Sequence, residues 1–377
     1  MNPWDAPRPR GAVGAARALA HRARVRVRDL RHNLRAGRPE RRIVVLRQWH
    51  NNWNYNDHFL AWVHARVPEA APLFSLHRAP GRMPALDCCA LLVPWLQDPL
   101  RERFPDVFAW VRRVEDACAA RAIPIVNPVA HLSHAVKSVA AGLIAATGIR
   151  TARMVPIADP AAFRRDQGGL TPPFFVRENV RHGSVMVMID DLADLDRVPW
   201  AGFEAPVAVE FVDVRGPDGL YRRYRYVAIG ERGIARSLRT TATWRSTREA
   251  RIFDDATCAE EVRYLTRPDP NHARLQRARV ALGLDTVAFD YGYAAGGELV
   301  VFEPNPLPNL WDPTGGPRYQ AYQVPLFDLI YGELLRYYLR RAGRARPALS
   351  ALPAVPVLGA SDAGSRHAAA PRNTSTR

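Results

Sequence analysis

Cysteines and long apolar runs are scarce in this chain of 377 residues. The four cysteines, Cys88, Cys89, Cys118 and Cys258, have neither the spacing of a zinc site nor the density of a disulfide framework. They predict buried thiols in a reducing compartment, and hence a cytoplasmic protein. No run of about 18 apolar residues occurs, which predicts that the chain has no stable membrane insertion. No Ser-His-Asp or Cys-His motif indicates a protein nucleophile.

Acidic residues are outnumbered by basic ones, 37 against 53, which gives a net charge of +16. The excess lies at the two ends of the chain. Residues 1–42 contain twelve arginines and three acidic residues, a net charge of +9, and residues 340–377 contain seven arginines and one aspartate, a net charge of +6. The middle of the chain is therefore close to neutral, which argues against a nucleic-acid-binding core.

The two basic ends are predicted to lie outside the folded part of the chain. Residues 1–41 form a basic arm. Its segment 15–37 is either solvated and partly disordered, which we favour, or a basic amphipathic helix with Val27, Leu30 and Leu34 on one stripe. Residues 346–377, rich in Ala, Pro and Ser, are predicted to be disordered. Either end is suited to contact an acidic partner, such as anionic lipid or RNA.

Alternating strands and helices from residue 42 to residue 128 predict a small open α/β domain. Its predicted strands are 42–48, 71–77, 88–95 and 123–127, and its predicted helices are 56–67 and 107–122. Residues 49–58, rich in Trp, His and Asn, are predicted either to contact a substrate or to cap the next helix. The later part of the chain mixes strands at 172–177, 206–214, 221–230 and 233–241 with helices at 257–267, 269–283 and 326–343. The predicted fold class is therefore α/β with an α+β second part.

The segment 286–310 carries the most informative pattern. Alternating residues on both sides of Gly296-Gly297 predict a β-hairpin with a two-residue turn. With the turn centred there, Asp290 faces Glu303 on the neighbouring strand, and Asn305 follows on the same side. Two close carboxylates must share a proton or a cation, and carboxylate and amide oxygens are ligands suited to Mg²⁺. The alternative is a surface hairpin whose acidic residues face solvent.

Lysine is almost absent, because Lys137 is the single lysine among 53 basic residues. It lies on a predicted helix that starts near residue 131 and ends at Gly148. A compact ammonium group in a chain that otherwise uses arginine suggests a site that a guanidinium group does not fit, and chance is the alternative.

Taken in order, these motifs resemble those of the ATP-grasp superfamily, and within it the glutathione-synthetase-like and ribosomal-protein-modifying carboxylate–amine ligases. The resemblance covers about residues 43–343 and implies an ATP-grasp domain at 129–345 preceded by a small α/β domain at 42–128. It implies Mg²⁺ ligation by Asp290, Glu303 and Asn305, and ATP phosphate contacts from Lys137 and Arg177. It also implies an adenine site at Glu210, Phe211 and Val212, ribose contact from Asp213, and roles for Arg225 at the transferred phosphoryl group and Arg239 near the acyl phosphate.

Two positions depart from the family pattern. Arg177 stands where a lysine commonly ends the strand, and Arg223 stands where an aspartate precedes the phosphoryl-binding arginine. An arginine still offers bidentate phosphate contacts, so the implied role of Arg177 is kept.

The resemblance implies an enzyme that uses ATP and Mg²⁺ to activate a carboxylate as an acyl phosphate and then joins it to an amine. The carboxylate partner would be an amino acid, a peptide or another small molecule. One alternative is an ATP-grasp phosphotransferase acting on a hydroxyl group or polyphosphate. The other is a nucleic-acid-associated or membrane-associated protein that uses its basic tails and binds a nucleotide incidentally.

Overall fold

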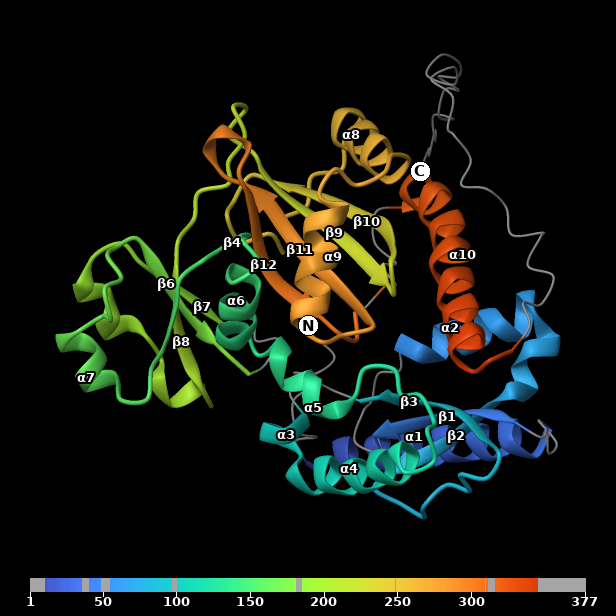
Figure 1. Cartoon of the computed structure of the whole chain (residues 1–377). Coiled ribbons are helices and arrows are strands. Elements are labelled where there is room, and N and C mark those ends of the chain that lie inside the picture. The colour runs from blue at the N-terminus through green and yellow to red at the C-terminus, as the bar shows by residue number, and fades with distance from the viewer. Residues whose placement is uncertain are drawn as a thin grey trace, which may run out of the picture.

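The computed structural model describes residues 11–35, 41–48, 55–96, 100–180, 185–247, 249–308, 310 and 316–344. Figure 1 shows three lobes, each built around one sheet, with the largest sheet in the middle. None of the helices in these ranges is long and apolar enough to cross a membrane.

The first lobe is a three-stranded parallel sheet in the order β2-β1-β3. The strands are β1 (Arg42–Gln48), β2 (Phe74–Ala79) and β3 (Cys89–Trp95), and the helices are α2 (Tyr55–Arg66), α3 (Leu100–Arg103) and α4 (Pro105–Ala119). Its strands are buried along almost their whole length, as expected for a parallel sheet covered on both faces. The small open α/β arrangement predicted for this part is confirmed.

Two strand predictions in the first lobe were wrong in part. Residues 71–73 belong to the 3-10 helix η2 (Pro68–Leu73), because Pro68 and Pro72 lack the N–H groups that a central strand needs. Residues 123–127 pair with β3 through a single bridge, Leu92 with Ile125, and the left-handed backbone of Asn127 ends the extended conformation.

The helix α1 (Gly11–Arg35) lies against the outer strand of this sheet. The Asn33 side chain pairs with both backbone groups of Leu76 in β2, at 2.8 Å and 2.9 Å. Asp29 accepts a hydrogen bond from Arg47 of β1 at 2.7 Å. The interpretation of residues 15–37 as a solvated arm is therefore wrong for residues 15–35, because polar side chains of the helix complete the edge of the sheet. Residues 346–377, predicted to be disordered, lie outside the described residues.

The middle lobe is a five-stranded sheet in the order β10-β9-β11-β12-β4. The strands are β4 (Arg150–Thr151), β9 (Tyr221–Ile229), β10 (Arg232–Thr241), β11 (Thr286–Tyr293) and β12 (Leu299–Asn305). The helices around it are α5 (Val129–Leu132), α6 (Lys137–Ala145), α8 (Asp255–Leu265), α9 (His272–Ala281) and α10 (Gly316–Arg341), with the 3-10 helix η3 (Ser133–Ala135) before α6. Alternate residues of β11 divide between its two faces. Phe289 and Tyr291 pack in the cluster that contains residues of α6 and α9, and Ala288 packs in the cluster that contains residues of α10.

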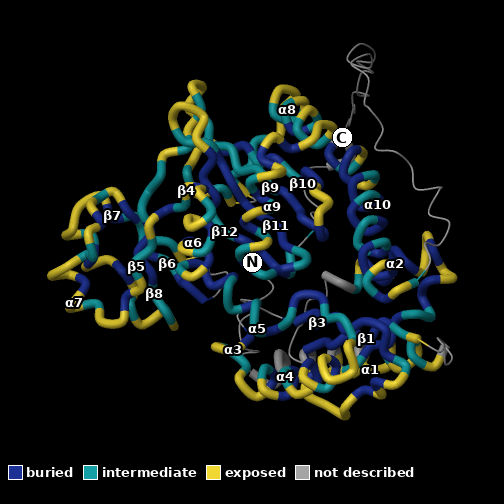
Figure 2. The backbone as a smooth tube through the Cα atoms, in the orientation of Figure 1, coloured by how far each residue is buried: buried dark blue, intermediate teal, exposed yellow. Residues whose placement is uncertain are grey.

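The third lobe is a four-stranded antiparallel sheet in the order β5-β8-β6-β7. The strands are β5 (Met154–Pro156), β6 (Phe174–Glu178), β7 (Met186–Ile189) and β8 (Pro206–Glu210). The helix α7 (Pro160–Arg165) and the 3-10 helices η4 (Leu192–Arg197) and η5 (Trp200–Gly202) belong to this lobe. Figure 2 shows the buried backbone concentrated in the sheets and the exposed backbone on the outer helices and loops. The strand predicted at 206–214 ends at Glu210, so Phe211, Val212 and Asp213 form a connection out of the sheet.

Candidate active site

A row of charged side chains crosses the middle sheet on one face. In the strand register, Arg225 of β9 stands opposite Asp290 of β11, and Asp290 stands opposite Glu303 of β12. The predicted pairing of Asp290 with Glu303 is therefore confirmed. The predicted two-residue turn was wrong, because residues 294–298 form a longer loop in which Gly296 and Gly297 both have positive φ, 77° and 80°.

Arg225 and Asp290 form a two-pronged ion pair. Arg225 donates from Nε to Oδ1 at 2.6 Å and from Nη2 to Oδ2 at 2.7 Å. The Asp290 side chain is 1% exposed, and burial alone would raise its pKa. The charges of Arg225 and Arg223 outweigh burial, so the pKa of Asp290 lies below its ordinary value. Asp290 is thus held ionised and fixed in orientation.

Glu303 joins the middle lobe to the third lobe. Arg177, from β6 of the third sheet, donates from Nη2 to Oε2 of Glu303 at 3.3 Å. The two side chains are separated by 126 positions in the chain. The Nε of Arg177 is buried and has no hydrogen-bond partner. This donor lies at the boundary of the two lobes, where an added anion would satisfy it.

Positive charge exceeds negative charge around this row. Arg239 of β10 stands opposite Arg223 of β9, two residues along the strand from Arg225. Burial and the neighbouring arginines lower the pKa of Arg239 well below its ordinary value, and burial lowers the pKa of Arg223. Four guanidinium groups therefore surround the two carboxylates of Asp290 and Glu303, the members being Arg177, Arg223, Arg225 and Arg239. Such crowding of like charges favours the binding of a polyanion.

Comparison with known proteins identifies the fold. No family model and no curated protein matches the chain. Two structures of the ATP-grasp ligase PsnB, one complexed with precursor peptide PsnA2 and AMPPNP and one complexed with a phosphomimetic variant of minimal precursor, Mg and ADP, match it with TM-scores of 0.50. They are 15% and 14% identical to this chain, and the matches cover 81% of this chain and 98% and 99% of theirs. The chain has the ATP-grasp fold.

The metal ligands predicted for this ATP-grasp fold lie together on the hairpin. Asn305, 8% exposed, is two residues beyond Glu303 and so shares its face of the sheet. The described residues contain no group of three His, Cys, Asp or Glu side chains placed to hold a metal. Two carboxylates and one amide nevertheless fit Mg²⁺, which takes few protein oxygens and completes its shell with water and phosphate oxygens. Each Asp290 oxygen keeps a second lone pair beside its bond to Arg225.

The sequence predicted that Lys137 lies within a helix that starts near residue 131. In the structure Lys137 is instead the first residue of α6. It is 5% exposed, and its Nζ donates to the backbone oxygen of Asn179 at 3.1 Å. Asn179 also accepts from the backbone N–H of Ser138, at 3.0 Å, and donates to its hydroxyl group. A phosphate group bound here would be stabilised by both the Lys137 ammonium group and the N-terminus of α6. The loop that follows Val180 includes residues 181–184, which lie outside the described residues.

The four residues predicted for adenine and ribose lie at the end of β8 and in the connection after it. The Glu210 carboxylate accepts from the backbone N–H of Arg153 at 2.9 Å and from Arg150 at 3.4 Å. Asp213 accepts from Arg215, and this bond lowers the pKa of Asp213. Phe211 and Val212 lie at the end of β8, with the Phe211 ring turned toward Trp244. The role of this segment in nucleotide binding stays a prediction.

A half-buried aromatic group beside this segment was not predicted from the sequence. The Trp244 ring lies 5.2 Å from that of Phe175 and 6.0 Å from that of Phe211, measured between centroids. Phe175 and Arg177 point to the same face of β6, so the aromatic group and the arginine share one side of the third sheet. The alternation of β6 is the only sequence signal for Phe175, and no local pattern marks Trp244. Three aromatic rings in this position suit a planar base.

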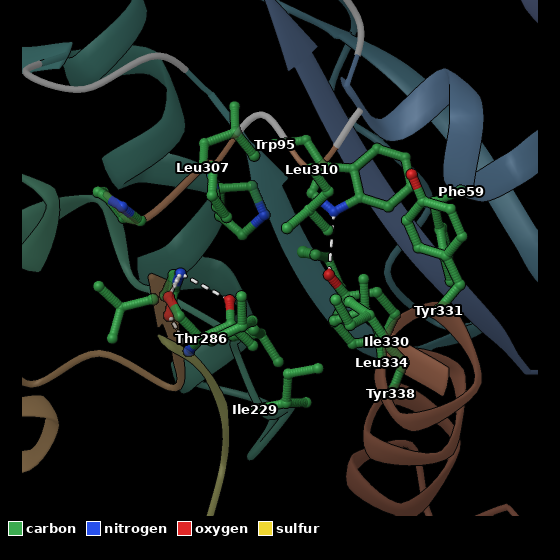
Figure 3. Close-up of a pocket in the computed structure, with 18 residues that line it drawn as sticks. Phe59, Trp95, Ile229, Thr286, Leu307, Leu310, Ile330, Tyr331, Leu334 and Tyr338 are labelled. Carbon is green, nitrogen blue, oxygen red and sulfur yellow. Dashed lines mark hydrogen bonds between the residues drawn. The ribbon is translucent and has the colours of Figure 1, made fainter. Parts of the chain in front are cut away.

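An apolar cavity of about 60 Å³ lies on the same face of the middle sheet as the charged row. Figure 3 shows it between β3, α10 and the chain after Asn305, with Trp95, Leu310, Ile330 and Tyr331 around it. Ile229 lines the cavity from β9, four residues beyond Arg225 on the same face, which is roughly 13 Å along the strand. Arg236 of β10 lies over the Phe327 ring at 4.9 Å. The cavity can accept an apolar group and offers few partners for a charge.

Proposed function

We propose that this protein is an ATP-dependent and Mg²⁺-dependent carboxylate–amine ligase that acts through an acyl phosphate. The observation that carries the proposal is the row formed by Arg225, Asp290 and Glu303, with three further arginines around it. It combines an anionic edge suited to a cation with an excess of guanidinium groups suited to phosphate. The ATP-grasp fold and the match to the PsnB complexes with AMPPNP and with Mg and ADP support the same assignment.

In the first step, an oxygen of the substrate carboxylate attacks the γ-phosphorus of ATP, and the bond to the β-phosphate oxygen breaks to release ADP. Arg225 and Arg239 would stabilise the charge on the phosphoryl group as it moves, and Arg177 and Lys137 would hold the remaining phosphates. Mg²⁺, held by Asp290, Glu303 and Asn305, would neutralise phosphate charge.

In the second step, the amine nitrogen attacks the acyl carbon, the carbon–oxygen bond to phosphate breaks, and the nitrogen loses a proton. No protein nucleophile is required. The rings of Phe175, Phe211 and Trp244 would pack against the adenine base of ATP. The apolar cavity favours a carboxylate or amine with an apolar portion.

A trapping experiment tests the reaction class. Enzyme, Mg²⁺ and ATP are incubated with a panel of carboxylates that includes amino acids with apolar side chains, and hydroxylamine replaces the native amine. We expect a hydroxamate together with ADP and phosphate, and loss of all three products when EDTA removes the metal. The Glu303→Gln variant is the matched control for background hydrolysis.

Other products would decide against the proposal. AMP and pyrophosphate would indicate adenylation of the carboxylate. A stable phosphorylated product without hydroxamate would favour the phosphotransferase alternative, in which the same row serves transfer to a hydroxyl group.

A further inference from the structure

The helix α1 exposes a stripe of large apolar side chains on one face. Leu19, Val27, Leu30 and Leu34 are 67%, 46%, 59% and 72% exposed. Their intervals of 8, 3 and 4 residues place all four on one side of a helix, over a length of roughly 22 Å. The exposed alanines Ala16, Ala20 and Ala23 lie in the same sector. Val27, Leu30 and Leu34 are the stripe of the helical alternative considered from the sequence, and Leu19 extends it. The stripe is not used to pack the helix against the protein.

The opposite face of α1 holds the helix to the first lobe. Asn33 pairs with both backbone groups of Leu76, and one ring nitrogen of His32 bonds to the backbone oxygen of Phe74 at 2.9 Å. Asp29 bonds to Arg47 at 2.7 Å. At about 100° per residue, the docked residues 29, 32 and 33 centre on the side of the helix away from the stripe. These bonds therefore fix the stripe facing outward.

Positive charge borders the stripe on both sides. The exposed residues Arg24 and Arg31 flank it on one side, and the exposed Arg26 flanks it on the other. The only acidic residue of α1 is Asp29, which lies on the docked face and bonds to Arg47. The outward face of the helix therefore combines leucine with arginine and presents no carboxylate.

We infer that α1 binds an anionic membrane surface, lying in the plane of the bilayer with its stripe at the boundary of headgroups and acyl chains. A helix with an apolar stripe bordered by arginines has the amphipathic form that membrane interfaces bind, and anionic headgroups match its charge. A second copy of the chain suits the stripe less well, because it would bring the arginines of two helices together. A nucleic acid would leave the leucines without an apolar partner.

The location of α1 is compatible with catalysis on a membrane. β2 is an outer strand of the first sheet, and α1 lies beyond it, whereas the charged row lies in the middle sheet. Attachment through the stripe would hold the enzyme at a surface and leave the proposed active site in another lobe. The inference does not depend on the proposed reaction.

Sedimentation with vesicles tests the inference on the full chain. We expect binding to vesicles of phosphatidylcholine with about one third phosphatidylglycerol, weak binding to pure phosphatidylcholine, and weaker binding as salt concentration rises. The Leu30→Gln/Leu34→Gln variant should lower the partition coefficient about tenfold or more, because it removes two of the four large apolar side chains of the stripe. The Arg24→Gln/Arg31→Gln variant should lower it by a similar factor on anionic vesicles only.

A matched control separates the stripe from exposed apolar side chains elsewhere on the molecule. Leu192 and Val280 are 43% and 65% exposed on other elements, so the Leu192→Gln/Val280→Gln variant should bind vesicles like the unmodified chain. Equal loss in this control, or unchanged binding of the Leu30/Leu34 variant, would overturn the inference. Failure of the unmodified chain to bind anionic vesicles would overturn it as well. A dimer that the Leu30→Gln/Leu34→Gln variant dissociates would then identify a second copy of the chain as the partner of the stripe, and binding of duplex DNA that the Arg24→Gln/Arg31→Gln variant weakens would identify a nucleic acid.

Discussion

Arg225 of β9 donates hydrogen bonds to both oxygens of the Asp290 carboxylate on the neighbouring strand β11, at 2.6 Å and 2.7 Å. The pair places a proposed phosphate-binding cation directly beside a proposed metal ligand. Because Asp290 is 1% exposed, neither side chain can change orientation without leaving a buried charge uncompensated. The side chains of the proposed active site are therefore positioned before any ligand binds.

Removal of either carboxylate should abolish turnover but should affect stability unequally. We expect both Asp290→Asn and Glu303→Gln to lower Mg²⁺-dependent ATP turnover by about 100-fold or more, because each loses an anionic ligand. Asp290→Asn should also lower the free energy of unfolding by about 3 kcal/mol, since it removes the buried carboxylate charge that pairs with Arg225. Glu303→Gln should cost about 1 kcal/mol or less, because its bond to Arg177 is longer and more exposed. Turnover assays and urea denaturation measure the two effects, and near-normal turnover in either variant would contradict the metal site.

The Asp290 ion pair should make stability depend on pH in the acid range. The pKa of Asp290 is lower in the folded state than its ordinary value of 3.8, so the stability it contributes is present above about pH 4 and is lost as the pH falls through the folded value. We expect the Asp290→Asn variant to lose less stability than the unmodified chain between pH 5 and pH 2.5. Urea midpoints measured across this range provide the check. If the urea midpoints of the two proteins changed with pH in parallel, Arg225 would not lower the pKa of Asp290.

The single lysine should not be replaceable by arginine. Lys137 is buried at the start of α6 with its Nζ 3.1 Å from the backbone oxygen of Asn179. A planar guanidinium group is larger and cannot keep this contact in the same space. We expect Lys137→Arg to raise the KM for ATP about tenfold with little change in the secondary structure seen by circular dichroism. Ser138→Ala is the control, because it alters the neighbouring contact to Asn179 but leaves the charge of Lys137. An unchanged KM in Lys137→Arg would show that a lysine at this position has no functional significance.

Truncation of the chain should separate stability from nucleotide binding. A chain that begins at residue 42 loses α1 and exposes the backbone of β2 at Leu76, so we expect a lower urea midpoint and a tendency to associate through that edge. Its affinity for Mg-ATP should stay within about twofold, because the proposed ligands lie in other lobes. Calorimetric titration measures the affinity, and Asn33→Ala in the full chain should reproduce part of the loss of stability. Failure of the truncated but folded chain to bind Mg-ATP would place α1 in the nucleotide site.

The sequence by itself determined the local elements of the site. Alternation along β11 and β12 and the glycines between them sufficed to pair Asp290 with Glu303, because a hairpin is formed by neighbouring residues and its register follows from its side-chain pattern. The order of motifs along the chain sufficed for the ATP-grasp fold, which the structure matches confirm. The same local reasoning failed where proline and a left-handed residue interrupted the strand pattern, at 71–73 and near Asn127.

Only the tertiary structure decided which distant residues meet. Arg177 reaches Glu303 from another sheet, and Trp244 packs against Phe175 across the boundary of two lobes. The pairing of Asn33 with Leu76 turned a segment predicted to be a solvated arm into part of the first lobe and left its leucine stripe facing outward. Periodicity specifies which side chains share a face of a helix or strand, but the partner of that face depends on how the lobes pack against each other. These contacts join positions far apart in the chain, so no local pattern could encode them.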